Sequence, residues 1–271
     1  MERPVIWSCK GCCYVINASS VFNFYVPNPA VPATPGNRYA DKSASAVIGR
    51  PEPEPGVSDT VYGFNSNTGN RSMSLHSLSG APRFTVQDRR GNDTLDFSGF
   101  SQNQTIDLRD GAASSVGGLR NNVSIGKGVT VENAVGGAGH DVLIGNNVDN
   151  VLTGGTGGDV LWGVGGTNTF RYEKASDSPY YNADLIMDFV SGRDKIDLTQ
   201  MMKEINTPLQ LVDDYTGRIG DTVVKFNPQS GRYFVGVDLT ERCESNFLIK
   251  SARWVRPSDL VGPVVERQRP V

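Results

Sequence analysis

Residues 136–171 read GGAGHDVLI, GNNVDNVLT, GGTGGDVLW and GVGGTNTFR, four nonapeptides joined without an intervening residue. The first and third units fit the pattern G-G-x-G-x-D-x-U-x, in which U is a large apolar residue, and this pattern is typical of a parallel β-helix. The apolar position is filled in all four units, by Leu143, Leu152, Leu161 and Phe170. A glycine-rich linker would lack such a period, so we expect a coiled fold.

The aspartates of the first and third units predict a metal site. Because two nonapeptides complete one coil, Asp141 should lie directly above Asp159. Stacked carboxylates repel each other unless a cation lies between them. Ca²⁺ takes six or more oxygen ligands, and turn carbonyls could complete the set, from Gly137, Gly139, Gly154 and Thr156. We therefore predict a calcium site here.

The second and fourth units depart from the pattern. Asn150 and Asn168 stand where the other units have Asp, and Val164 replaces a glycine. A calcium site between Asn150 and Asn168 would depend on amide oxygens and on the displaced Asp149. The sequence leaves both outcomes open for this pair.

The composition limits the function classes. The chain of 271 residues has 31 glycines and a formal net charge of −3, which disfavours a nucleic-acid-binding protein. No run of 18 apolar residues occurs, so no membrane-spanning helix is expected. We expect a monomer that binds calcium ions and no nucleic acid.

Residues 1–56 differ in amino-acid composition from the rest of the chain. Their prolines and small residues cannot build a core, so we predict a largely disordered leader. Cys9, Cys12 and Cys13 form a C-x-x-C-C motif that could supply part of a zinc site. A closed zinc site needs a fourth ligand, and no histidine lies nearby. We favour free thiols.

From residue 57 onward, short pairs of apolar residues predict strands separated by turns, without a helical period. The pairs are Phe84 and Val86, Leu95 and Phe97, Ile106 and Leu108, Val123 and Ile125, and Val129 and Val131. We expect a roll over 57–200. Strands expected at 209–211, 221–226, 232–239 and 246–254 predict an antiparallel cap over 201–271. The fold class is all-β, a parallel β-roll with an antiparallel β cap.

Four longer segments carry a family resemblance. They are DTVYGFNSNTG at 59–69, GNDTLDFSGFSQNQTIDL at 91–108, VGGLRNNVSIGKGVTVENAVGGAGHDVLIGN at 116–146 and DLIMDFVSGRDKIDL at 184–198. Together they resemble the C-terminal half of serralysins, which are secreted bacterial zinc endopeptidases, over about residues 57–261. The resemblance implies a secreted, extracellular protein whose roll binds several calcium ions.

The resemblance also implies calcium ligands outside the nonapeptides. One ion would lie among Asp59, Thr60, Asp88, Arg90 and Asp93; a second would be shared by Gly91, Asp93, Thr130 and Glu132; and Asp177 with Asp184 match an acidic pair after the repeats. Arg90 stands where the family usually has glycine, and its position could require a φ that only glycine accepts cheaply. Taken singly, each carboxylate could instead cap a turn.

The catalytic half of the family carries H-E-x-x-H-x-x-G-x-x-H, in which three histidines hold Zn²⁺ and the glutamate activates its water. This chain has two histidines, and neither begins that motif, since His76 precedes SLSG and His140 precedes DVLI. We therefore expect no Zn²⁺ and no proteolytic activity. His140 occupies the variable position of its turn and is expected to be exposed.

We interpret the chain as a calcium-binding, non-catalytic module that folds on Ca²⁺ binding after type I (ABC) secretion. A fragment with zinc endopeptidase activity and a stand-alone adhesion or decoy protein remain alternatives. The leader does not resemble the catalytic half, which suggests a truncated or rearranged gene. Asp259-Leu260-Val261 resembles the family's terminal export signal, but GPVVERQRPV follows it, so we expect weak secretion.

Overall fold

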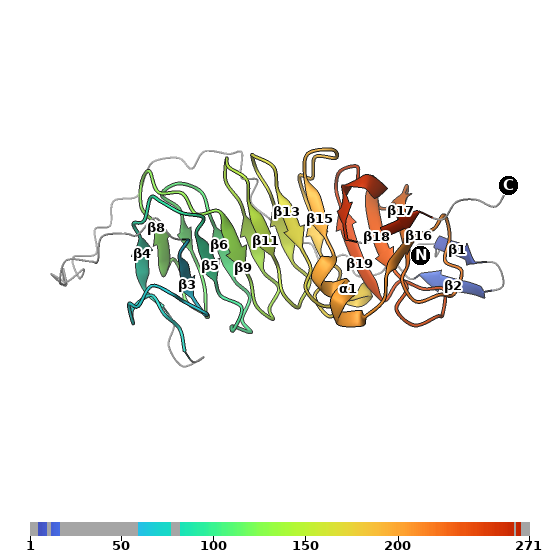
Figure 1. The fold of residues 1–271 in the computed structure, drawn as a ribbon, viewed down its shortest axis with the longest axis horizontal. Helices are drawn as coiled ribbons and strands as arrows, with labels where there is room; N and C mark the ends of the chain where they lie inside the picture. Colours follow the sequence, from blue (N-terminus) through green and yellow to red (C-terminus); the bar gives the residue numbers. More distant parts are fainter. Residues whose placement is uncertain (1–4, 10–11, 17–58, 77–81, 263, 267–271) are drawn as a thin grey trace.

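The computed structural model describes residues 5–9, 12–16, 59–76, 82–262 and 264–266. Within the predicted leader, β1 (Val5–Cys9) and β2 (Cys12–Ile16) pair antiparallel. The prediction of disorder otherwise lies outside the described residues, as do the side chains of the cysteine cluster. The rest of the chain forms an elongated body in which short strands cross the long axis (Figure 1).

Two long sheets make up this body. One contains, in spatial order, β21 (Val264–Glu266), β16 (Leu209–Leu211), β17 (Asp221–Asn227), β18 (Arg232–Val237), β19 (Phe247–Ser251), β14 (Leu185–Ile186), β12 (Val160–Trp162), β10 (Val142–Ile144) and β6 (Thr105–Asp107). The other contains β20 (Leu260–Val261), β15 (Lys195–Asp197), β13 (Thr169–Arg171), β11 (Val151–Thr153), β9 (Asn133–Val135), β5 (Thr94–Asp96) and β3 (Val61–Gly63). A smaller sheet contains β4 (Phe84–Val86), β8 (Val123–Ile125) and β7 (Ala113–Ser114).

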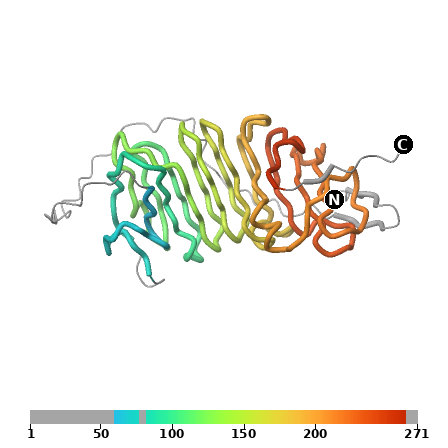
Figure 2. Tube along the Cα trace, viewed as in Figure 1, coloured from blue at the N-terminus to red at the C-terminus, as the bar shows by residue number. Residues whose placement is uncertain are grey.

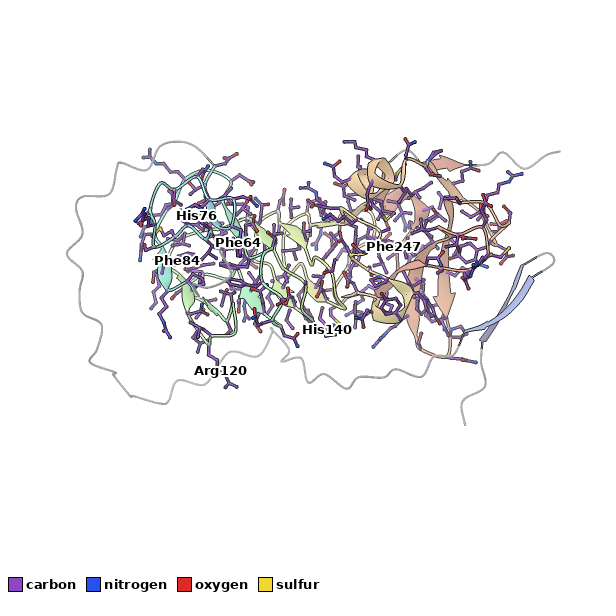
Figure 3. All side chains as sticks on the ribbon, turned by 90° about the horizontal axis from the view of Figure 1, so that it is seen from below. Phe64, His76, Phe84, Arg120, His140 and Phe247 are labelled. Atoms are coloured by element: carbon purple, nitrogen blue, oxygen red, sulfur yellow. The ribbon has the colours of Figure 1, made fainter. Side chains whose placement is uncertain are left out.

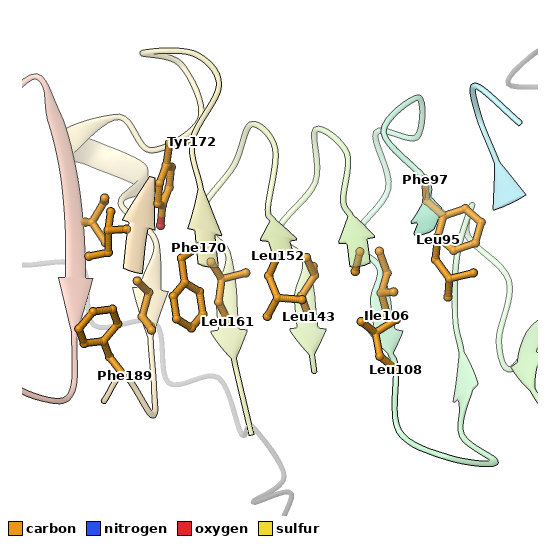
Figure 4. Close-up of a cluster of buried hydrophobic side chains, with 14 of the residues drawn as sticks. Leu95, Phe97, Ile106, Leu108, Leu143, Leu152, Leu161, Phe170, Tyr172 and Phe189 are labelled. Atoms are coloured by element: carbon orange, nitrogen blue, oxygen red, sulfur yellow. The ribbon is translucent and has the colours of Figure 1, made fainter. Parts of the chain in front are cut away.

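The chain alternates between the two long sheets through the nonapeptides, so that successive coils lie side by side (Figure 2). Leu143 in β10 pairs in register with Leu161 in β12, and Leu152 in β11 with Phe170 in β13, all parallel. These four side chains are 0% exposed and meet along the roll axis (Figure 4). The prediction of two nonapeptides per coil is therefore confirmed.

The glycines of the first unit serve close packing. Positive φ angles occur at Gly155, Gly157 and Gly166, in the later units. Gly137 has no positive φ, but a Cβ there would overlap the carbonyl of Phe100 on the preceding coil. At Gly137 the nearness of the neighbouring coil, and not a positive φ, is therefore what excludes a side chain.

The cap continues both sheets of the roll. β17, β18 and β19 are antiparallel, with residues 228–231 as the hairpin connection between β17 and β18. In contrast, β19 pairs parallel with β14 and β20 pairs parallel with β15. The predicted cap strands are present. In the roll, Val129 and Val131 are buried but lie outside any strand. No sequence pattern predicted α1 (Thr199–Ile205), η1 (Tyr180–Asn182) or η2 (Pro257–Asp259). None of the described helices is long and apolar enough to cross a membrane.

The backbone conformation of Val164 is strained, and a substitution can test this. Its φ is +66°, in the left-handed region, where a β-branched residue is an outlier. We predict that Val164→Gly raises the free energy of unfolding by about 1 kcal/mol, measured by urea denaturation. Gly231→Val is the matched control, since it places the same side chain at φ +65° in open space and should lower the free energy of unfolding. A Val164→Gly variant less stable than the parent chain would contradict this account.

Candidate metal sites

The aspartates of consecutive coils form a ladder of backbone-to-carboxylate hydrogen bonds, here called the acidic ladder (Asp141, Asp159 and Asp184). The N–H of Asp141 donates to Asp159 Oδ1 at 2.8 Å, and the N–H of Asp159 donates to Asp184 Oδ1 at 2.8 Å. The ladder ends at Gln104, whose N–H donates to Asp141 Oδ1 at 2.8 Å. The predicted stacking of Asp141 on Asp159 is therefore what the fold produces.

The second carboxylate oxygen of Asp159 is buried and has no hydrogen-bond partner in the described structure. Asp159 is 1% exposed. Burial raises the pKa of Asp159 to about 8, and the neighbouring charges of Asp141 and Asp177 add to the rise. At neutral pH this carboxyl would have to be protonated or be matched by a positive charge that the side chains do not supply.

The other end of the acidic ladder, at Asp184, is fully enclosed. Asp184 is 0% exposed, and burial together with the charge of Asp159 raises its pKa well above the usual carboxyl range. The buried Tyr172 ring lies beside it and packs edge-on against Phe247, with ring centroids 5.4 Å apart. Asp177 is also buried, and its Oδ2 accepts the N–H groups of residues 173 and 174 at 2.8 and 2.9 Å. Three carboxylates thus share a region that excludes water.

No described ion pair neutralises this region. The four side-chain ion pairs of the described residues involve Asp107, Asp194, Asp197 and Asp214. Lys250 interacts electrostatically with Asp184, but its Nζ donates to the Ala183 carbonyl at 3.2 Å. The acidic ladder therefore has carboxylate oxygens in excess over cationic partners.

Backbone carbonyls of the predicted turns approach the same place. A Cβ on Gly155 would overlap the carbonyl of Gly137, and one on Gly157 would overlap the carbonyl of Gly139. Gly154 passes so close to Asp159 Oδ2 that a Cβ there would overlap it. Thr156 lies in the same turn. The turns thus bring carbonyl and carboxylate oxygens together, which is the donor chemistry that Ca²⁺ prefers.

A second acidic cluster lies at the start of the roll. The N–H of Thr60 donates to Asp93 Oδ1 at 3.0 Å, its hydroxyl donates to Asp88 Oδ2 at 3.4 Å, and the N–H of Asp93 donates to Glu132 Oε2 at 2.7 Å. Asp59 Oδ1 accepts the N–H of Asn92 at 2.8 Å. Burial raises the pKa of Asp93 to about 6, and its Oδ2 is buried without a described partner.

Two further predicted ligands of this region are Arg90 and Thr130. Arg90 donates its N–H to Asp88 Oδ1 at 3.1 Å and has no positive φ, so the residue that needs glycine is Gly91, at φ +94°. The concern that Arg90 occupies a glycine-only conformation is therefore wrong. Thr130 is exposed, two positions before Glu132.

The predicted pair Asn150 and Asn168 also stacks, since the N–H of Asn150 donates to Asn168 Oδ1 at 3.2 Å. Sequence reasoning missed several polar residues that join these ladders. Gln104 donates from its side chain to Asp141 Oδ2 at 3.3 Å, and Asp194 Oδ1 accepts the N–H of Asn168 at 3.0 Å. Their spacing from the repeat, 37 and 26 positions, does not follow the 18-residue period, so no periodic signal marks them.

Side chains alone do not complete a metal site. Among the described residues, no group of three or more His, Cys, Asp or Glu side chains could hold a metal ion by itself. The two histidines, His76 and His140, lie far apart along the roll (Figure 3). His140 is exposed, as expected, and its ring accepts the N–H of Gly158 at 2.9 Å. An ion at either acidic cluster would need backbone carbonyls as well as carboxylates.

The fold and these clusters define a parallel β-roll with stacked acidic turns. Residues 54–261 match the family described as the C terminal of peptidase M10 serralysin, and the chain belongs to this family. It is 46% identical over 213 residues to metallopeptidase AprA of Pseudomonas marginalis, covering 75% of this chain and 44% of that protein. It is 44% identical over 201 residues to serralysin C of Dickeya chrysanthemi, covering 71% and 42%. The chain thus spans less than half the length of these relatives.

Two solved structures align with part of the chain at lower sequence identity. The AlgE6R3 subunit of the Azotobacter vinelandii mannuronan C5-epimerase aligns with a TM-score of 0.39 and 21% identity, covering 60% of this chain and 79% of that one. The AlgE6R2 subunit of the same enzyme aligns with a TM-score of 0.40 and 19% identity, covering 66% and 96%.

The raised pKa values of Asp93 and Asp159 predict how stability depends on pH without metal. Between the usual carboxyl value of 3.8 and these raised values of about 6 and about 8, the folded chain binds more protons than the unfolded one. The free energy of unfolding therefore falls as pH rises through this window. In chelator, we expect a higher melting temperature near about pH 5 than near about pH 8. A chelated chain that melts higher at the more alkaline pH would contradict this expectation.

Proposed function

We propose that this chain is a calcium-binding, non-catalytic module of a serralysin-like protease, which folds outside the cell as it binds calcium. The observation that carries the proposal is the buried Asp159 carboxylate, whose Oδ2 has no described hydrogen-bond partner and whose neighbours on the acidic ladder are also acidic. A cation bound there would supply the positive charge that the side chains lack.

The available donors fit a hard cation. Asp141 and Asp159 would hold one ion, together with the carbonyls of Gly137, Gly139, Gly154 and Thr156. At the start of the roll, Asp59, Thr60, Asp88, Arg90 and Asp93 would hold a second, and Gly91, Asp93, Thr130 and Glu132 a third. Asp177 and Asp184 would contribute to a further site. All these groups offer oxygen, which suits Ca²⁺ rather than a softer metal.

Calcium dependence would couple folding to location. In a compartment poor in calcium the acidic ladder is repulsive, whereas at high calcium the bound ions add their binding free energy to folding. Sites of extracellular modules bind calcium in the range of about 10⁻⁴–10⁻³ M, which separates the two environments. The module would therefore stay incompletely folded inside the cell, with the acidic ladder open, and complete its folding after export.

The C-terminal segment supports export before folding. Asp259, the acidic residue of the proposed export signal, is 0% exposed, and its carboxylate accepts the hydroxyl of Ser191 at 2.6 Å and the N–H of Gly192 at 2.9 Å. Leu260 is buried and pairs with Ile196 of β15. A type I transporter that reads these residues would have to contact them before the cap forms.

Substitution of the central aspartate tests the calcium site. We predict that Asp159→Ala raises the calcium concentration at the folding midpoint by about tenfold or more, measured by circular dichroism during calcium titration from chelator. The exposed Glu173 provides a control, since Glu173→Ala should leave the midpoint unchanged. A spectrum of the parent chain that is the same in chelator and in calcium would sink the proposal.

Proteolysis is the alternative, because the relatives are metallopeptidases by name. The chain has two histidines, too few for a three-histidine zinc site. We predict that the purified chain cleaves no casein, with or without added Zn²⁺. Cleavage that chelator abolishes and Zn²⁺ restores would overturn the non-catalytic assignment.

A further inference from the structure

The turns opposite the acidic ladder contain asparagines where the acidic turns contain aspartates. Asn150 and Asn168 are 1% and 0% exposed, and they occupy the same position of their nonapeptides as Asp141 and Asp159. No atom of either amide is among the buried polar atoms that lack a partner, in contrast to Asp159 Oδ2. We call this pair the amide ladder.

The orientation of the Asn168 amide is fixed by its neighbours. Its Oδ1 accepts the N–H of Asn150 at 3.2 Å, and a backbone N–H can only meet an acceptor. The Nδ2 group therefore faces its own turn, where it donates to the carbonyl of Gly165 at 2.9 Å. At the matching place on the acidic side, Asp159 presents Oδ2, which cannot donate to a carbonyl.

The amide of Asn150 is also bonded at both its oxygen and its nitrogen, but the two roles are exchanged: the oxygen bonds its own turn and the nitrogen reaches Glu132. Its Oδ1 accepts the N–H of Asn146 at 2.8 Å, which directs Nδ2 toward the carbonyl of Glu132 at 2.9 Å and Asn146 Oδ1 at 3.0 Å. Asn146 in turn donates its Nδ2 to the carbonyls of Leu108 and Val131 at 3.1 and 2.8 Å. The Gly165 carbonyl, which matches the predicted Thr156 ligand of the acidic turns, thus has an N–H donor, as does the Glu132 carbonyl.

The charged side chains near the amide ladder also have hydrogen-bond or ion-pair partners. Asp194, which accepts the N–H of Asn168, forms an ion pair with Arg193 at 3.0 Å. Asp149 is exposed, and its Oδ1 accepts the N–H of Thr167 at 2.7 Å. Asp188, which is half-buried, accepts the N–H groups of Gly163 and Val164 at 2.8 and 2.7 Å. No carboxylate oxygen of Asp149, Asp188 or Asp194 is among the buried polar atoms that lack a partner.

We propose that the side-chain amides of Asn150 and Asn168 take the place of a cation in their turns, so that one side of the roll is held together without metal and the other requires it. These turns therefore do not fit the calcium site that the sequence left open for them. The contrast between the two sides rests on the proposed calcium binding by the acidic ladder. The amide side itself rests only on the hydrogen bonds above.

The test is the isosteric variant Asn168→Asp in the full chain. In chelator, its new carboxylate oxygen would face the Gly165 carbonyl without a proton, so the melting temperature should fall by on the order of 5 °C relative to the parent chain. Added calcium should restore it, because the variant recreates the donor set of the acidic turns. In the double variant Asn150→Asp with Asn168→Asp, equilibrium dialysis should detect about one more bound calcium per chain than in the parent.

Asn147→Asp is the matched control, since Asn147 lies in the same turn as Asn150 but is exposed. It should change neither the melting temperature in chelator nor the number of bound ions. An Asn168→Asp variant that melts like the parent chain in chelator, or one that calcium does not rescue, would overturn the proposal. Equal ion counts for the parent and the double variant would also overturn it.

The outcomes separate this inference from the proposed function. A parent chain that binds no calcium would refute the proposed function. The chelator melts of Asn168→Asp and Asn147→Asp would then still decide whether the amides hold their turns, because that measurement needs no bound ion.

Discussion

The stability of the roll depends on what satisfies one buried oxygen atom, Asp159 Oδ2. The backbone places each carboxylate of the acidic ladder where the preceding coil donates an N–H to one of its oxygens. At Asp159 the other oxygen is buried without a described partner. A buried carboxylate without a partner is costly unless it is protonated or matched by a cation. The same geometry that stacks the coils thus creates the need for a proton or a cation at this oxygen, and we propose that calcium supplies it.

The two sides of the roll stack their turns in the same way but satisfy the buried side-chain atoms differently. Both ladders use a side-chain oxygen to accept an N–H from the preceding coil, Asp159 for Asp141 and Asn168 for Asn150. An amide then has a donor left for the turn carbonyls, whereas a carboxylate has only a second acceptor. In our account, the choice between Asp and Asn at one position of the nonapeptide decides whether a turn needs metal.

Much of this fold could be predicted from the sequence because the nonapeptide period determines which residues stack. Leu143, Leu152, Leu161 and Phe170 all fall in the core, and the acidic residues meet as their spacing indicates. Contacts outside the period could not be predicted. Gln104 reaches Asp141 across 37 positions, and the short helix α1 has no distinct pattern, since it is held by the burial of Met201 and Met202. The role of Asn150 and Asn168 stayed open because an amide can offer either an oxygen or an N–H, and only its neighbours decide which.

Hydrogen exchange at single backbone amides tests the central claim most directly. The N–H groups of Asp141 and Asp159 donate to the acidic ladder, and those of Asn150 and Asn168 donate to Asn168 and Asp194 on the other side. We predict that the first pair is strongly protected in calcium and loses this protection first when chelator is added, at a pH where the second pair is still protected. Protection of Asp141 and Asp159 that is the same with calcium and with chelator would contradict the account.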